Sequence, residues 1–289
     1  MRRGLACRCP LIEYGWQVRR NSRSMKALTV EQIGAWERNG FLKVENFVDA
    51  DELANIRRIM EGLVEQDPPH EATLVDIDPV LADRADIPRT EKFRALMHAA
   101  HASRELLETY TLRPRTLDVV EDLIGPDIVY YTDQTFLKPP GGSGAPAHQD
   151  NGYWDVFWSG KGKLSVWLAL DDSTLERGCT QFVPGSHRQV LQHDRDFSKD
   201  ALFGGAVPDL DPDQLDFEAV ELKAGDACMH HCEIIHRSGP NVSDHSRRGL
   251  VTIYFSGRCT YTDQASEWFP HRMIPARGHV YPGCVGWYE

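Results

Sequence analysis

The sequence has no uninterrupted apolar stretch that approaches the roughly 18 residues needed by a membrane-spanning helix. It also lacks an excess of positive charge, because 43 acidic residues outnumber 32 basic residues and give a formal net charge of -11. A phosphate backbone or an anionic membrane surface would on average repel such a chain. We therefore expect neither a membrane protein nor a general nucleic-acid binder.

Cysteines are few, and their spacing is not that of a disulfide or zinc framework. Their number is odd, at 7, and a chain of 289 residues can bury a large core without disulfide staples. No Cys-x-x-Cys pair occurs anywhere in the sequence. These features indicate a reducing compartment, and we expect a cytoplasmic protein.

The first residues differ from the rest in composition. Residues 1–24 carry six arginines against a single acid, Glu13, and show no apolar periodicity. Such a segment has the composition of a transit peptide, but a start assigned too early, with Met25 as the true first residue, is the interpretation we favour. We expect residues 1–24 to be a peripheral leader or a misassigned start, and residues 25–289 to form a single domain.

The part from about residue 25 to 126 is predicted to be helical. Thr29 followed by Gln32, and Asp49 followed by Glu52, have the spacing of capping boxes that open helices. Gly40 should end the first helix and Pro68 the second. Further helical patterns lead up to Gly125-Pro126.

From about residue 127 to 260, short β-rich runs alternate with glycine- and proline-rich turns. Many short strands of this kind favour a barrel or jelly roll over a parallel sheet. We therefore expect a mainly β protein with flanking helices, followed by a C-terminal tail at 261–289. The strands are expected at 128–131, 135–137, 164–170, 180–183, 227–229 and 250–255.

A His-x-Asp pattern at His148 and Asp150 is the first candidate for a metal site. In an extended segment these two side chains point the same way and can bind one ion. His236 is the expected third ligand, with His230 and His231 as alternatives that strand alternation alone does not exclude. Two histidines and one carboxylate, with other positions open, suit non-haem Fe(II).

Arg247 is a candidate for binding a carboxylate-bearing co-substrate, because its guanidinium presents a planar fork of donors. A different function is also conceivable from the sequence. Cys228, Cys232 and His236 could bind a structural zinc ion, which would make the chain a zinc-stabilised, non-catalytic binding protein. The absence of a second paired motif weighs against that interpretation.

The order of these residues resembles the phytanoyl-CoA dioxygenase family over about Leu28 to Phe255. The resemblance implies a double-stranded β-helix (jelly roll, cupin-like) that uses Fe(II), 2-oxoglutarate and O2. The matching segments are Leu137-Lys138-Pro139, His148-Gln149-Asp150 with Tyr153-Trp154, Trp167 to Asp172, Gly178-Cys179, Val183 to His187, Gly225-Asp226 and His236 to Arg247.

Carried over residue by residue, the resemblance implies that His148, Asp150 and His236 bind the iron. It implies that the enzyme hydroxylates an unactivated C–H bond of a small molecule and releases succinate and CO2. Halogenating relatives carry a small residue in place of the carboxylate, whereas Asp150 is present here. The residues expected to bind 2-oxoglutarate are Arg247, with Ser238 beside it, and then Gln134, Trp167 and Lys92.

Overall fold

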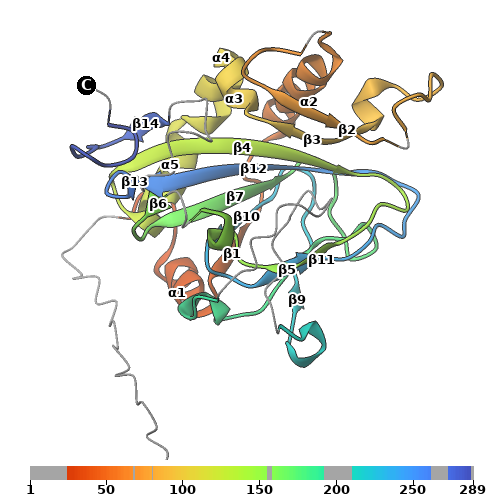
Figure 1. Cartoon of the computed structure of the whole chain (residues 1–289). Coiled ribbons are helices and arrows are strands. Elements are labelled where there is room, and N and C mark those ends of the chain that lie inside the picture. The colour runs from red at the N-terminus through yellow and green to blue at the C-terminus, as the bar shows by residue number, and fades with distance from the viewer. Residues whose placement is uncertain are drawn as a thin grey trace, which may run out of the picture.

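A computed structural model of the chain describes residues 25–67, 69–79, 81–154, 158–191, 210–261 and 273–287. Two antiparallel sheets face each other, with the helices α2 (Ala50–Glu65), α3 (Ala99–Ala102) and α4 (Arg104–Leu106) on the outer side of the larger sheet (Figure 1). The smaller sheet lies on the opposite side (Figure 1). This is the expected mainly β fold, a double-stranded β-helix with flanking helices.

The larger sheet has the strand order β1-β10-β7-β12-β4-β3-β2, and β14 pairs with β4. Its two central pairs, β4 with β12 and β12 with β7, run antiparallel over long stretches. The bounds are β1 Phe41–Val44, β2 Leu74–Ile77, β3 Phe93–Met97, β4 Ile128–Lys138, β7 Lys163–Ala169, β10 Ala227–His231, β12 Arg247–Ser256 and β14 Ile274–Arg277.

The smaller sheet has the order β5-β11-β8-β9, and a separate two-stranded ladder joins β6 to β13. Both sheets draw on distant parts of the chain, as a jelly roll requires. The bounds are β5 Ala145–His148, β6 Trp158–Ser159, β8 Thr180–Phe182, β9 Glu218–Ala219, β11 His236–Ser238 and β13 Thr260–Tyr261.

Both predicted capping boxes are present. The Thr29 side chain accepts a hydrogen bond from the Gln32 amide at 3.2 Å, and Asp49 accepts one from the Glu52 amide at 2.8 Å. The first helix ends at Gly40, as expected. The helices are α1 Val30–Asn39, α2 Ala50–Glu65, α3 Ala99–Ala102, α4 Arg104–Leu106, α5 Pro114–Ile124 and α6 Asn151–Trp154.

The structure contains strands beyond the expected ones, among them β5, β11 and β14, and it differs from the expected elements in two further ways. Residues 128–131 and 135–137 belong to one strand, β4, because the polar residues between them are buried and bonded: Asp133 accepts hydrogen bonds from the amides of Ala99 and Ala100 at 2.8 and 2.9 Å. In addition, β2 and β3 join the larger sheet from the part of the chain predicted to be helical.

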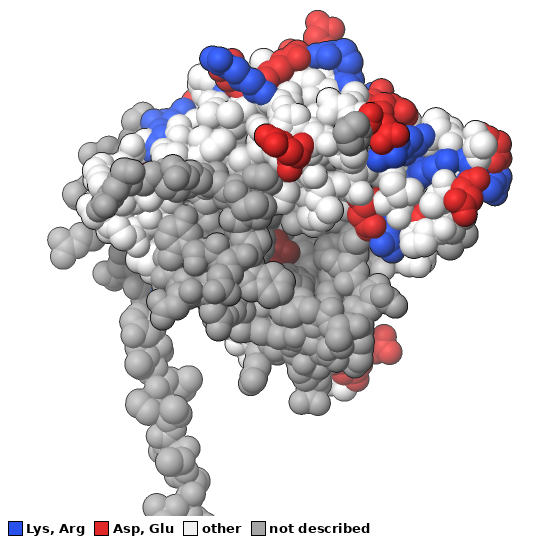
Figure 2. Space-filling view, turned by 45° about the horizontal axis from the view of Figure 1, so that its top comes forward, with Lys and Arg blue, Asp and Glu red and all other residues white. Residues whose placement is uncertain are grey.

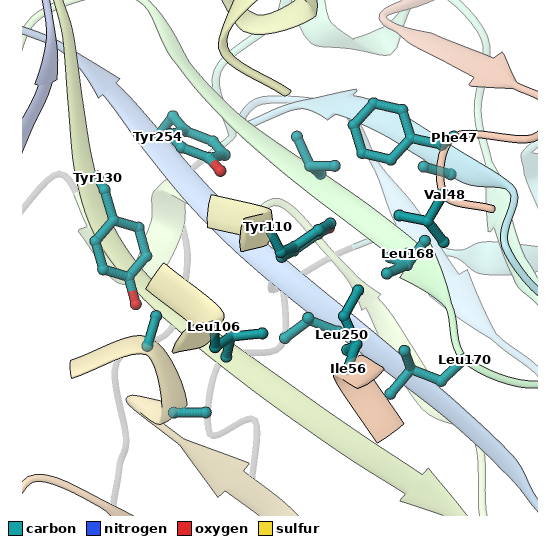
Figure 3. Close-up of a cluster of buried hydrophobic side chains, with 14 of the residues drawn as sticks. Phe47, Val48, Ile56, Leu106, Tyr110, Tyr130, Leu168, Leu170, Leu250 and Tyr254 are labelled. Carbon is teal, nitrogen blue, oxygen red and sulfur yellow. The ribbon is translucent and has the colours of Figure 1, made fainter. Parts of the chain in front are cut away.

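Apolar side chains form two cores on opposite faces of the larger sheet. The outer core packs the helices against the sheet and includes Tyr254, whose hydroxyl donates to the Thr111 carbonyl at 2.8 Å (Figure 3). The inner core contains Trp167, Val251 and Phe182. The inner core therefore lies between the sheets, where the candidate site residues also lie.

Within the described residues, no helix is long and apolar enough to cross a bilayer.

The capping box of α1 provides a test of the fold. Thr29→Ala should lower the free energy of unfolding by about 0.5–2 kcal/mol, because the Gln32 amide loses its acceptor. Chemical denaturation monitored by circular dichroism measures this change. Thr29→Ser keeps the acceptor oxygen and should retain most of the stability; equal losses in both variants would show that the cap is not the cause.

Candidate active site

His148, Asp150 and His236 come together at the edge of the smaller sheet. His148 ends β5 and pairs directly with His236, which begins β11, while Asp150 lies in the turn after β5. The Nε2 atoms of His148 and His236 lie 3.6 and 3.5 Å from Asp150 Oδ1. One ligand atom from each residue lies within 4.8 Å of the others. The expected triad therefore forms, although Asp150 is not on the strand itself.

Hydrogen bonds to the backbone set the tautomer of both imidazoles. His148 Nδ1 lies 2.8 Å from the Pro146 carbonyl oxygen, and His236 Nδ1 lies 3.0 Å from that of Ile234. A carbonyl oxygen only accepts, so each Nδ1 carries the proton and each Nε2 presents a lone pair. Three acceptor atoms then converge with no proton between them, an arrangement that a bound cation stabilises.

Burial keeps His236 in the form that binds metals. Burial, and after it the proximity of His148, lowers the pKa of His236 to about 3. The imidazole is therefore neutral at physiological pH, and its Nε2 is available as a ligand.

The second oxygen of Asp150 is held by the larger sheet. Ser165 on β7 and His230 on β10 both bind Asp150 Oδ2 at 3.0 Å, and the two residues are direct partners across these strands. Burial raises the pKa of Asp150, but the hydrogen bonds donated to its carboxylate, among them that of His230, favour the ionised form and hold the pKa below its usual value. The carboxylate is thus ionised and oriented with Oδ1 toward the two histidines.

Gln149 anchors the turn between the two ligands. Its side chain is fully buried, and its amide nitrogen donates to the carbonyls of Gln189 and Glu233 at 2.7 and 2.6 Å. Its amide oxygen accepts from the Leu191 amide at 2.9 Å. The His-Gln-Asp triplet is therefore fixed to two other segments by the one side chain that points away from the triad.

Arg247 is a buried cation with unused hydrogen-bonding capacity. Its side chain donates to the Gly178 carbonyl, and its Nε has no hydrogen-bond partner among the described residues. Burial lowers the pKa of Arg247 to about 10, so the guanidinium remains charged at neutral pH. A buried, charged donor of this kind fits a carboxylate ligand.

Trp167 lies beside Arg247 on the inner face of the larger sheet. The Arg247 guanidinium carbon is 5.2 Å from the centre of the indole ring. The ring covers Gly249, where the Cβ of any larger residue would come within 2.1 Å of the indole. Glycine at this position therefore allows Trp167 to form one wall of the space next to Arg247.

The remaining sequence candidates differ in their placement. Ser238 on β11 accepts hydrogen bonds from Lys138 Nζ at 2.9 Å and from the Ala145 amide at 3.2 Å. Gln134 is half-buried and pairs with Val251, which also pairs with Trp167, so these residues form one row across the sheet. Lys92 donates to the Ala82 carbonyl at 3.4 Å, and within the described chain its contacts reach neither Arg247 nor the triad.

The predicted zinc site does not form. Cys228 lies on β10, whereas Cys232 lies in the turn after that strand, and their thiols do not join His236 in a metal-binding group. Burial raises the pKa of Cys228 to about 12, so its thiol stays protonated. The zinc alternative is therefore not supported, and both cysteines are buried residues of the inner core.

The sequence alone does not predict the roles that His230 and Lys138 have at the site. Strand alternation leaves His230 as an alternative ligand, but the structure separates it from His236 by a turn and places it on Asp150 instead. Lys138 stands in the sequence only as part of a matching segment. A lysine that ends a buried strand directly before Pro139-Pro140 is a usable signal, because a charge in such a position needs specific partners.

A family model described as phytanoyl-CoA dioxygenase (PhyH) matches residues 36–249. A protein of Arabidopsis thaliana named phytanoyl-CoA dioxygenase is 24% identical over 283 residues, covering 89% of this chain and 98% of its own length. The crystal structure of EvdO2 from Micromonospora carbonacea var. aurantiaca, complexed with 2-oxoglutarate, is 25% identical, with a TM-score of 0.64 and coverage of 83% and 96%. That of the epimerase SnoN, in complex with Fe3+, alpha ketoglutarate and nogalamycin RO, is 23% identical, with a TM-score of 0.63 and coverage of 88% and 94%.

The contacts of Asp150 Oδ2 generate a prediction about metal binding. His230→Phe should weaken Fe(II) binding by about 10- to 100-fold, because the carboxylate loses a donor that orients it. Anaerobic competition with a coloured chelator measures the dissociation constant. Ser165→Ala, which removes the other donor, should act in the same direction.

His231→Phe is the matched control for His230→Phe. His231 is the next residue on β10, and its Nδ1 accepts from the Glu233 amide at 3.1 Å instead of contacting Asp150. The His231→Phe variant should bind Fe(II) as tightly as the wild type. Equal Fe(II) affinities in the wild type and in the His230→Phe variant would contradict the role of His230 in positioning Asp150.

Proposed function

The chain belongs to the phytanoyl-CoA dioxygenase family, and from that premise we propose which of its residues carry out the reaction and what kind of molecule it oxidises. The enzyme is a non-haem iron dioxygenase that depends on 2-oxoglutarate. When bound together, Fe(II) and 2-oxoglutarate activate O2 for oxidation of a C–H bond, with cleavage of the co-substrate to succinate and CO2. The residues of this chain bind, orient and enclose these groups.

His148, Asp150 and His236 are the proposed iron ligands. The observation that carries this assignment is the convergence of Nε2, Oδ1 and Nε2 with no proton between them. Two histidines and one carboxylate leave coordination positions open for a co-substrate, in the arrangement that suits non-haem Fe(II). Ser165, His230 and the two backbone carbonyls hold the ligands in that orientation before the metal arrives.

Arg247 is the proposed partner of the distal carboxylate of 2-oxoglutarate. Its open Nε donor and its burial beside Trp167 support the assignment. Ser238 supplies a hydroxyl nearby, and Gln134 lies in the row of residues that includes Trp167. We rank Gln134 and Trp167 as secondary contacts. Lys92 was expected from the sequence, but its own contacts add no support to a role at this site.

Hydroxylation of a small molecule is the proposed outcome. Asp150 occupies the carboxylate position, and its contacts leave Oδ1 for the metal, so no ligand position is vacated for a halide. Charged residues of both signs are interspersed on the visible face of the molecule, which suits a small-molecule substrate better than a polyanion (Figure 2). The epimerase SnoN shares the fold but is named for a different reaction. Because the fold alone does not identify the reaction, we propose hydroxylation from the residues of this chain.

We also propose that residues 25–289 act as a single oxygenase domain in the cytoplasm. The five cysteines within the described residues are all free and buried, which fits a reducing compartment.

The iron assignment predicts the behaviour of ligand variants. His236→Ala should lose 2-oxoglutarate-dependent O2 consumption and bind Fe(II) with a stoichiometry near zero, because one of three ligands is removed. Iron analysis after anaerobic gel filtration and an oxygen electrode measure these effects. His245→Ala, at an exposed histidine, is the control; full iron content in His236→Ala would refute the assignment.

The Arg247 assignment predicts a change in co-substrate affinity. Arg247→Ala should weaken 2-oxoglutarate binding by about 2–5 kcal/mol, the usual cost of removing one partner of a buried charge pair. Anaerobic calorimetry on the Fe(II)-loaded protein measures it. Arg104→Gln is the control, because that arginine is exposed and pairs with Glu108 at 2.7 Å. Wild-type affinity in the Arg247 variant would place the carboxylate elsewhere.

A further inference from the structure

Lys138 and Arg247 place two cations side by side on neighbouring strands of the larger sheet. They are direct partners across β4 and β12, and both donate to the Gly178 carbonyl, with Lys138 Nζ at 3.4 Å. Lys138 Nζ also lies 2.9 Å from Ser238 Oγ and 2.5 Å from the Gly239 carbonyl oxygen. The amine thus contacts Ser238 and Gly239 and shares the Gly178 carbonyl with Arg247.

Neither cation forms an ion pair within the described part of the chain. The acids nearby are engaged elsewhere: Asp171 pairs with Arg248 and Arg57, and Glu221 accepts from the Leu175 amide at 2.6 Å. The remaining titratable neighbour is Cys179, and burial raises its thiol pKa, so it carries no charge at neutral pH. Among the described residues, no anion pairs with either of these two cations.

This crowding affects the charge of Lys138. Burial, and after it repulsion from Arg247, lowers the pKa of Lys138 to about 7. The ammonium form can donate to all three surrounding oxygens, whereas the neutral amine can donate to two of them and accept from the Ser238 hydroxyl. In the free enzyme at mildly alkaline pH, Lys138 is therefore largely neutral, whereas Arg247 keeps its charge.

We propose that Lys138 is a second binding residue for the distal carboxylate of 2-oxoglutarate, and that its amine takes up one proton from solvent when the co-substrate binds. The inference rests on the proposed function, since it concerns the 2-oxoglutarate site proposed at Arg247. The negative carboxylate compensates the repulsion between the two cations and so favours the ammonium form. Only a proton moves, from water to Nζ, and no covalent bond to the co-substrate is formed.

The proposal fixes the sign of the pH dependence. Because binding raises the pKa of Lys138, affinity is greatest below the free-state value of about 7 and falls as pH rises above it. The fall is at most about tenfold per pH unit and continues until the pH reaches the pKa in the complex. At about pH 8 the free amine is mostly deprotonated, so binding should take up about 0.9 proton per co-substrate.

Calorimetry on the wild-type protein tests this directly. The Fe(II)-loaded enzyme is titrated anaerobically with 2-oxoglutarate at about pH 8 in buffers of different ionisation enthalpy, which yields the number of protons taken up. Uptake of about 0.9 proton and a loss of affinity above about pH 7 support the proposal. Binding with no proton uptake, at an affinity that does not change with pH, overturns it without affecting the proposed function.

Two variants assign the proton to Lys138. Lys138→Met should bind 2-oxoglutarate more weakly at about pH 6.5, by about tenfold or more, and should take up no proton at about pH 8. Lys138→Arg keeps a permanent charge and should bind with no uptake and little pH dependence. Lys43→Met, at a half-exposed lysine that pairs with Glu45, is the control and should behave as the wild type does.

Two further outcomes would also overturn the proposal. If Lys138→Met and Lys138→Arg still take up the wild-type number of protons, the proton binds at another residue. If the wild-type protein binds Fe(II) but no 2-oxoglutarate, the proposed function fails, and the role of Lys138 fails with it.

Discussion

The mutual repulsion of three acceptor atoms is the constraint on which the site depends. His148 Nε2, Asp150 Oδ1 and His236 Nε2 point at one another without an intervening proton, and in the absence of a cation this arrangement is unfavourable. The surrounding structure holds it in place. Backbone carbonyls fix both imidazoles, the larger sheet binds Asp150 Oδ2 through Ser165 and His230, and Gln149 anchors the turn. Stability is thus given up locally to keep a metal site ready to bind.

The two sheets have complementary electrostatic roles. The smaller sheet supplies the two histidines, and the larger sheet supplies both Arg247 and the donors that orient Asp150. One part of the space between the sheets therefore attracts a cation, while another carries uncompensated positive charge from Arg247 and Lys138. In the proposed complex, a dianion such as 2-oxoglutarate would satisfy both parts, with one end held at the metal and the other at the two cations.

Local sequence patterns predicted much of the fold. The capping boxes at Thr29 and Asp49 depend on contacts three residues apart, and strands such as β7 and β12 contain runs of apolar residues bounded by turns. Continuity of β4 was not predictable in this way, because Asp133 is compatible with a strand only through its bonds to α3 amides. The strands β5 and β11 are short, and their pairing depends on contacts distant in sequence. The His-x-Asp pattern located the triad, whereas the partner of Asp150 Oδ2 and the charge on Lys138 depend on tertiary neighbours.

The central claim is that this chain binds Fe(II) through the triad and chelates 2-oxoglutarate on that iron. The most direct measurement is a visible absorption titration of metal-free protein with Fe(II) and then 2-oxoglutarate under anaerobic conditions. A chelated 2-oxo acid on Fe(II) gives a charge-transfer band, and we expect this band in the wild type. Binding of Fe(II) with no band on addition of 2-oxoglutarate would contradict the account.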